Sequence, residues 1–255
     1  MNNVIKFPKP REGAIWFEVK NLTETSADVY IYDEIGEGMF GGGISAISVI
    51  DQLKALGSRE LNVRINSPGG SVFEGVAIYN ALARHAGEVT THIDGIAASI
   101  ASIIAMAGKR VLIAENAMMM IHNPWSFAGG DSAQMRKTAD VLDQIKETLI
   151  TTYATRTGIE RESIARMMDE ETWMTASEAV AQKFADESVA GVKAAACFDL
   201  KSYGYAKAPA SSADADSCQP ANAGTPSSSN TPRSLLQRRQ ALNEKVSNNQ
   251  IHVTK

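Results

Sequence analysis

The chain has 255 residues, 44% of them apolar, which is enough for one α/β domain of about 200 residues with an appendage. Its net charge is −4, from 25 Lys and Arg against 29 Asp and Glu, and no basic stripe interleaved with aromatic residues is visible, which argues against nucleic-acid binding. Cys197 and Cys218 have neither metal-ligand spacing nor a neighbouring pair of histidines, so we expect no zinc site, no disulfide framework and a reducing, cytoplasmic compartment.

Neither a signal peptide nor a membrane span is expected. Residues 1–12 carry charges and prolines but no apolar core. The longest apolar stretch, 96–108, is too short for a bilayer and is interrupted by Ser99 and Ser102. We therefore expect a soluble protein without a membrane partner.

In chain order, the first half of the sequence alternates strand patterns with helical ones. Residues 14–19 and 27–32 have the apolar pattern of strands, and the glycine-rich run 36–43 then breaks regular structure. Apolar residues at three-residue spacing from Ile44 predict a helix that ends at Gly57. The pattern then predicts a strand over 61–65, a helix over 72–86 and a strand over 89–93.

The second half continues this alternation. We predict a helix beginning near Ala98, strands over 110–113 and 118–121, a long helix after Asp131 or Ser132 that Gly158 closes, and short helices over 161–168 and 176–183. Strands and helices in strict succession imply right-handed βαβ units around a mostly parallel sheet. The predicted fold class is therefore α/β.

The composition divides the chain into an N-terminal segment 1–26, a domain 27–193 and a low-complexity tail 194–255. Ala, Ser, Pro, Asn and Asp dominate 206–231, which predicts a disordered linker because little apolar area is available to offset the entropy of ordering. Residues 234–246 have the pattern of one short amphipathic helix, either a docking peptide or a transient helix. So short an isolated helix favours the second interpretation.

Ser99 lies between a predicted strand and a predicted helix, in the sequence DGIAASIAS. Ligands bind at this edge of a parallel sheet, and the free N–H groups at a helix start suit an oxyanion. A serine in this position is also a common helix N-cap. The residue alone leaves both interpretations open.

A second turn, INSPGG over 65–70, also follows a predicted strand and precedes a helix. Gly69 and Gly70 permit backbone conformations in which successive N–H groups point into a cleft. This would supply the second arm of an oxyanion hole, although the composition alone favours an ordinary strand-to-helix turn.

His122 ends a run of apolar strand residues and is followed by Asn123 and Pro124, which stop the strand. A histidine there is either a general base or a satisfied structural residue. The acidic run 169–171 offers carboxylates to orient an imidazole, or it is merely solvated.

Together, the ordered motifs INSPGG, GIAAS, MIHNP and the acidic segment running into TWMTASEAV resemble the ClpP-like serine peptidases over residues 27–188. The resemblance implies the ClpP/crotonase-like fold of repeated ββα units with a protruding handle helix, here 132–156. It implies Ser99 as nucleophile and His122 as base, with the N–H groups of Gly70 and Ile100 as oxyanion hole. The position that matches the family's usual aspartate is Glu171, and Asp169 is the reserve candidate. No cofactor or metal is implied.

The resemblance also implies how substrate binds. A peptide would lie as an added strand between the edge at Gly69 and Gly70 and the segment after His122, with Asn123, Pro124 and Trp125 beside it and 126–130 along it. Within the family, ETW, HNPW and the glycine-rich entry at 34–43 resemble the prohead proteases of tailed phages. That branch implies capsid and scaffold proteins as substrates, a homo-oligomeric ring, and a place in assembling proheads in the bacterial cytoplasm.

Four alternatives stay open at this stage. The chain is a general Clp-type peptidase that degrades unfolded proteins with an ATPase partner, a crotonase-type acyl-CoA enzyme that uses the paired amides without a nucleophile, a Ser–Lys peptidase with Lys109 as base, or a scaffold protein with a degenerate peptidase domain.

Overall fold

The computed structural model describes residues 17–36, 43–191, 198 and 200–209. The chain divides into two units, Met1–Gln219 and Pro220–Lys255, and every described residue belongs to the first. In chain order its elements are β1 Phe17–Lys20, β2 Ser26–Ile31, α1 Ala46–Leu56, β3 Glu60–Ser67, α2 Val72–Ala83, β4 Val89–Ala98, α3 Ile100–Ala105, β5 Arg110–Ala114, β6 Met118–Ile121, α4 Ser132–Thr157, α5 Arg161–Asp169, β7 Thr172–Thr175, α6 Ala176–Ala181, β8 Glu187–Val189 and the 3₁₀ helix η1 Leu200–Tyr203.

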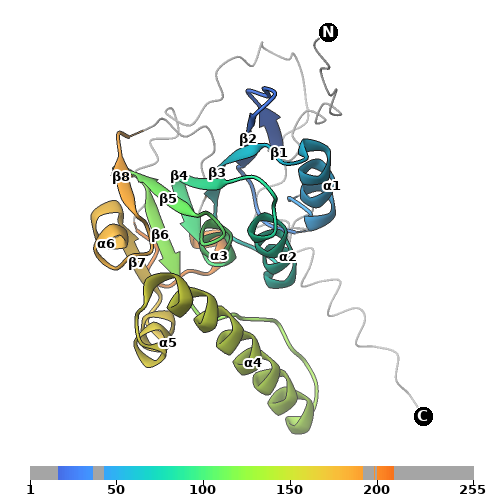
Figure 1. Ribbon diagram of the computed structural model, residues 1–255. Coiled ribbons are helices and arrows are strands. Elements are labelled where there is room, and N and C mark those ends of the chain that lie inside the picture. Colours follow the sequence, from blue (N-terminus) through green and yellow to red (C-terminus); the bar gives the residue numbers. More distant parts are fainter. Residues whose placement is uncertain (1–16, 37–42, 192–197, 199, 210–255) are drawn as a thin grey trace, which may run out of the picture. The chain divides into compact units, whose positions relative to one another are not determined.

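The strands form one mostly parallel sheet (Figure 1). Its order is β1-β2-β3-β4-β5-β8, and β6 joins the sheet beside the second half of β4 and carries β7 on its other edge. The pairs β1–β2 and β6–β7 are antiparallel, whereas the others are parallel. The predicted α/β fold class is confirmed.

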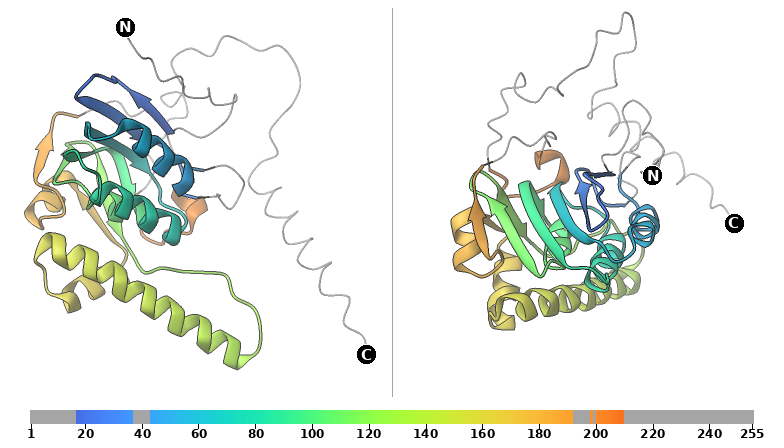
Figure 2. Two further views of the ribbon diagram at one scale, coloured as in Figure 1. Left: turned by 45° about the vertical axis from the view of Figure 1, so that its right-hand side comes forward. Right: turned by 45° about the horizontal axis from the view of Figure 1, so that its top comes forward.

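Helices α1, α2 and α3 lie side by side along one face of the sheet, as Figures 1 and 2 show. The alternation of β3 explains this layer, because Leu61, Val63 and Ile65 are fully buried on the helical face. The opposite face carries Arg64, which forms a 2.9 Å ion pair with Asp94 of β4. The apolar core therefore sits between the sheet and one layer of helices.

Helix α4 is the long helix predicted after residue 131. Asp131 caps it by accepting hydrogen bonds from the N–H groups of Ala133 and Gln134, and Gly158 ends it in the left-handed conformation. Among its buried residues are Leu149, Ile150 and Tyr153, all in its C-terminal half, so the N-terminal half extends beyond the sheet (Figure 2).

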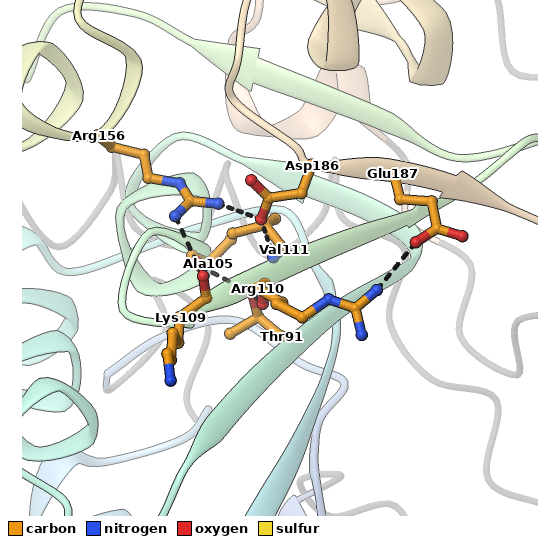
Figure 3. A network of polar contacts seen from close by, with 8 residues as sticks. All are labelled: Thr91, Ala105, Lys109, Arg110, Val111, Arg156, Asp186 and Glu187. Atoms are coloured by element: carbon orange, nitrogen blue, oxygen red, sulfur yellow. Dashed lines mark hydrogen bonds and ion pairs between the residues drawn. The ribbon is translucent and has the colours of Figure 1, made fainter.

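A polar network fixes the C-terminal end of α4 to the edge of the sheet (Figure 3). The Arg156 guanidinium pairs with the Asp186 carboxylate, which also accepts a 2.7 Å bond from the Val111 N–H of β5. Beside it, Arg110 of β5 pairs with Glu187 of β8 at 2.9 Å. Helix, strand and loop are thus held at one point, which orients the helix.

Two features of the sheet differ from the sequence-based expectation. Strand β4 runs to Ala98 instead of ending at 93, because it pairs with β5 over Thr90–Ile93 and then changes partner to β6 over Ile96–Ala98. The helix expected near Ala98 accordingly begins at Ile100. The short strands β7 and β8 were not predicted, since runs of three or four residues carry too little periodicity.

The first part of the expected tail is described and packs on the domain. Leu200–Tyr203 forms η1, and residues 204–209 follow without helix or strand, with turns at 204 and 206–207. Figure 2 shows this segment, in orange, across the sheet from α2 and α3. Residues 210–255, which include most of the linker expected over 206–231 and the helix expected over 234–246, lie outside the described residues. None of the helices described here is long and apolar enough to cross a membrane.

Candidate active site

Ser99 occupies the sharp turn between β4 and α3. Its φ of 55° and ψ of −129° are a strained conformation for a residue with a side chain, and such strain is concentrated at functional sites. Its N–H donates to the Met120 carbonyl at 2.9 Å, which ties the turn to the end of β6. Its hydroxyl lies 2.8 Å from Nε2 of His122. The structure thus brings two residues 23 positions apart in the sequence into hydrogen-bonding contact.

His122 follows the last residue of β6, the fully buried Ile121. Burial lowers the pKa of the imidazole, and the negative charge of Glu171 only partly opposes this shift. The ring is therefore neutral near pH 7. A neutral imidazole can accept the hydroxyl proton of Ser99 through Nε2 while Nδ1 keeps its own.

The two glycines of the SPGG turn allow its backbone to approach Ser99 closely. A Cβ on Gly69, whose φ is 101°, would lie 2.7 Å from Cβ of Ser99 and 2.8 Å from the Ala98 carbonyl oxygen. A Cβ on Gly70, at φ 142°, would lie 2.2 Å from the Ile35 carbonyl oxygen. Both positions exclude any other residue on steric grounds.

The backbone pattern shows which way the amide of Gly70 points. Ile35 donates to the Gly69 carbonyl at 2.7 Å and accepts from the Ser71 N–H at 2.8 Å. In a parallel ladder this leaves the N–H and C=O of Gly70 on the opposite edge, the edge nearer to Ser99. Among the described residues, neither this amide nor that of Ile100 donates to a backbone acceptor. Both amides are therefore free to bind a carbonyl oxygen.

The negative charge of Glu171 acts on His122, but the Glu171 carboxylate accepts its hydrogen bonds from other residues. It accepts hydrogen bonds from Nε1 of Trp173 at 3.0 Å, from the Ala206 N–H at 2.7 Å and from the Lys207 N–H at 2.6 Å. Partial burial opposes ionisation, but these donors and the nearby imidazole outweigh it and lower the pKa of Glu171. The carboxylate is ionised, and within the described part of the chain it has no hydrogen bond to His122.

The reserve acid Asp169 has a different environment. Its exposed carboxylate pairs with Lys146 of α4 and accepts a 2.8 Å bond from Nδ2 of Asn123. These donors lower its pKa. Asp169 therefore anchors the residue after His122, and no contact with the imidazole itself is present among the described residues.

The remaining predicted contacts lie along the segment after His122. Asn123 and Pro124 are half-buried, whereas Trp125 is exposed and packs edge-on against Phe127 with ring centroids 5.3 Å apart. Lys109, the base required by a Ser–Lys mechanism, lies just before β5 and pairs with Glu88. Because β4 and β5 run parallel, that places Lys109 at the far end of the sheet from Ser99, which argues against the Ser–Lys alternative.

Tyr205 is the residue of this site that sequence reasoning missed. Its ring packs edge-on against His122, with centroids 5.2 Å apart, and its hydroxyl donates to the Pro68 carbonyl oxygen. The only local signal is that 198–205, FDLKSYGY, is rich in aromatic and apolar residues within an Ala- and Ser-rich region. Among the described residues, no group of three or more His, Cys, Asp or Glu is arranged to hold a metal ion.

Comparison with known proteins decides the family, because the model of the Clp protease family matches residues 11–191. The chain belongs to the Clp protease family. It is 36% identical over 163 residues to the ATP-dependent Clp protease proteolytic subunit 3 of Streptomyces coelicolor. The aligned region covers 60% of this chain and 75% of that protein.

Further relatives carry the same name. The ATP-dependent Clp protease proteolytic subunit of Bacteroides fragilis is 34% identical over 132 residues, with 51% of this chain and 63% of that protein covered. The subunit of Pleurastrum terricola is 39% identical over 124 residues, with 48% and 63% covered. The aligned segments thus span 60 to 75% of the relatives' own length. By class, the family consists of serine peptidases, and this chain has the corresponding fold.

Proposed function

We propose that the chain is a serine endopeptidase in which Ser99 is the nucleophile and His122 the general base. The observation that carries the proposal is the 2.8 Å contact between Ser99 Oγ and His122 Nε2 in a member of the Clp protease family. The lowered pKa of His122 supports it, because the base must be neutral to accept a proton.

The reaction proceeds in two steps, acylation of Ser99 and hydrolysis of the acyl-enzyme. Ser99 Oγ attacks the peptide carbonyl carbon while its proton passes to Nε2 of His122, and the amides of Gly70 and Ile100 bind the oxyanion. The C–N bond then breaks, and the amine leaves with the proton from His122. In the second step water attacks the acyl-enzyme, gives a proton to His122, and releases the carboxylic acid as Ser99 regains its proton.

Substrate binds as an extended strand along the free edge of the SPGG turn. The outward N–H and C=O of Gly70 support this arrangement, since they are directed away from Ile35. The segment 126–130 lies along the other side of the peptide, with Asn123, Pro124 and Trp125 beside it. Because main-chain bonds dominate, sequence specificity is modest.

The proposal is tested by hydrolysis of an unfolded protein and of short fluorogenic peptides, without ATP. Wild type and Ser58→Ala, which alters an exposed serine between α1 and β3, are expected to cleave, whereas Ser99→Ala is expected to lose activity by several orders of magnitude. A fluorophosphonate probe separates the peptidase from a crotonase-type enzyme, which has no nucleophile to label. Hydrolysis by Ser99→Ala at the wild-type rate would refute the assignment.

Two substrate classes remain within the proposal. The prohead-like motifs favour capsid and scaffold proteins processed by a homo-oligomeric ring in the cytoplasm, whereas the names of the relatives favour degradation of unfolded proteins with an ATPase partner. Co-expression with a capsid precursor separates them. Cleavage at defined sites without an ATPase supports the first, and an intact precursor beside folded, active protein supports the second.

A further inference from the structure

The segment 200–209 covers the face of the sheet on which the proposed catalytic residues lie. Tyr205 is 8% exposed and joins Ile96, Ala98 and Met120 in an apolar cluster separate from the main core. Ile96 and Ala98 belong to the C-terminal end of strand β4, just before Ser99, and Met120 lies two residues before His122. Tyr205 is therefore seated on the backbone that carries the nucleophile and the base.

The phenol of Tyr205 contacts two of the segments that form the site. Its hydroxyl donates to the Pro68 carbonyl oxygen, in the residue before Gly69, and its ring packs edge-to-face against the His122 ring, with centroids 5.2 Å apart. Substrate must bring its carbonyl carbon to Ser99 Oγ beside Gly69 and Gly70. The phenol and a substrate acyl group cannot occupy this space together.

The same segment also binds the acid of the site. The N–H groups of Ala206 and Lys207 account for two of the three hydrogen bonds that the Glu171 carboxylate accepts. An orienting acid must instead accept the Nδ1–H of the imidazole. Consecutive residues thus contact the SPGG turn, the base and the acid at once.

We propose that segment 200–209 is an intramolecular inhibitor, in which Tyr205 fills the position of a substrate side chain and the next two amides hold Glu171 away from His122. This inference rests on the proposed peptidase function. Displacement of the segment admits substrate and frees Glu171. The surface that it uncovers, Ile96, Ala98, Met120 and Trp173, accepts an aromatic or large apolar side chain.

Peptide hydrolysis by the full-length chain tests the inference. If only a fraction of molecules is open, the apparent KM is raised by the inverse of that fraction. Tyr205→Ala is therefore expected to lower KM by at least about tenfold with kcat little changed. Tyr79→Ala, which truncates a half-buried tyrosine of α2, is the matched control and is expected to leave KM unchanged. A merely structural Tyr205 would give the reverse, a lower kcat/KM together with a lower Tm.

Hydrogen exchange of the wild-type chain provides a second test that needs no variant. Covalent occupation of Ser99 by a bulky fluorophosphonate is expected to increase exchange in the peptide that contains Ala206 and Lys207. Unchanged protection on fully labelled protein, or equal KM values for wild type and Tyr205→Ala, would overturn the inhibitory role while leaving the peptidase intact. Absence of both hydrolysis and labelling in wild type and in Tyr205→Ala would overturn the proposed function, and the inference with it.

Discussion

Replacement of Gly69 by alanine tests how closely the SPGG turn must approach the nucleophile. The new Cβ would lie 2.7 Å from Cβ of Ser99 and 2.8 Å from the Ala98 carbonyl oxygen, at a φ of 101°. Strain at such a φ costs about 1–3 kcal/mol, and forcing an extra carbon into a packed site costs about the same. We expect the chain to lose about 2–6 kcal/mol of stability, or to relieve the clash by moving Ser99.

Either response lowers activity. A displacement of the nucleophile by about 1 Å reduces the rate by about 100-fold. Peptide hydrolysis and a thermal melt, measured on the same preparation, therefore report a loss in kcat/KM of this size or larger. The control is Gly158→Ala, at φ 72° with no atom within 4 Å of the new Cβ, which costs about 1 kcal/mol of stability and leaves kcat/KM unchanged. Wild-type stability and activity in Gly69→Ala would refute the geometry.

The remaining predictions concern the proposed catalytic groups and their support. Ser99→Ala and His122→Ala each lower kcat by several orders of magnitude, and the double variant is little worse than either, whereas additive losses would contradict a shared mechanism. Activity requires neutral His122, so kcat/KM is expected to fall as the pH decreases, with a midpoint below the ordinary pKa of histidine. A midpoint above the ordinary histidine pKa would contradict the buried, neutral base. Glu171→Gln lowers kcat more than Asp169→Asn, because only Glu171 acts on the imidazole charge, and the reverse order in steady-state kinetics would reassign the acid. Asp186→Ala is expected to lower Tm and to leave kcat/KM unchanged. It removes the carboxylate that the Val111 amide and Arg156 share, at a cost of about 1–3 kcal/mol of stability. An unchanged Tm would show that this network does not hold α4.

Most of the fold was predictable because its elements are long and periodic. Nearby residues alone indicate these elements: the apolar spacing from Ile44 to Leu56, the caps Asp131 and Gly158, and the alternation of β3. The extension of β4 to Ala98 was not predictable in this way. It depends on a change of pairing partner, which is a property of the assembled sheet.

The site likewise has a part that the sequence predicts and a part that it does not. Ser99, His122 and the two glycines stand at strand ends, so their meeting follows once the sheet order is known. The bonds of Glu171 to Ala206 and Lys207, by contrast, join residues 35 and 36 positions apart through a segment whose composition resembles a linker. Nothing in the local sequence encodes that contact. Only tertiary packing of Tyr205 brings the segment to the site.

Peptide mapping of a fluorophosphonate adduct tests the assignment of the nucleophile most directly. The full-length chain is incubated with the probe at neutral pH, digested, and examined by tandem mass spectrometry. We expect one modified site, Ser99, with the modification lost in His122→Ala because the hydroxyl then has no base. An adduct on another serine, or equal labelling of Ser99 with and without His122, would contradict the account.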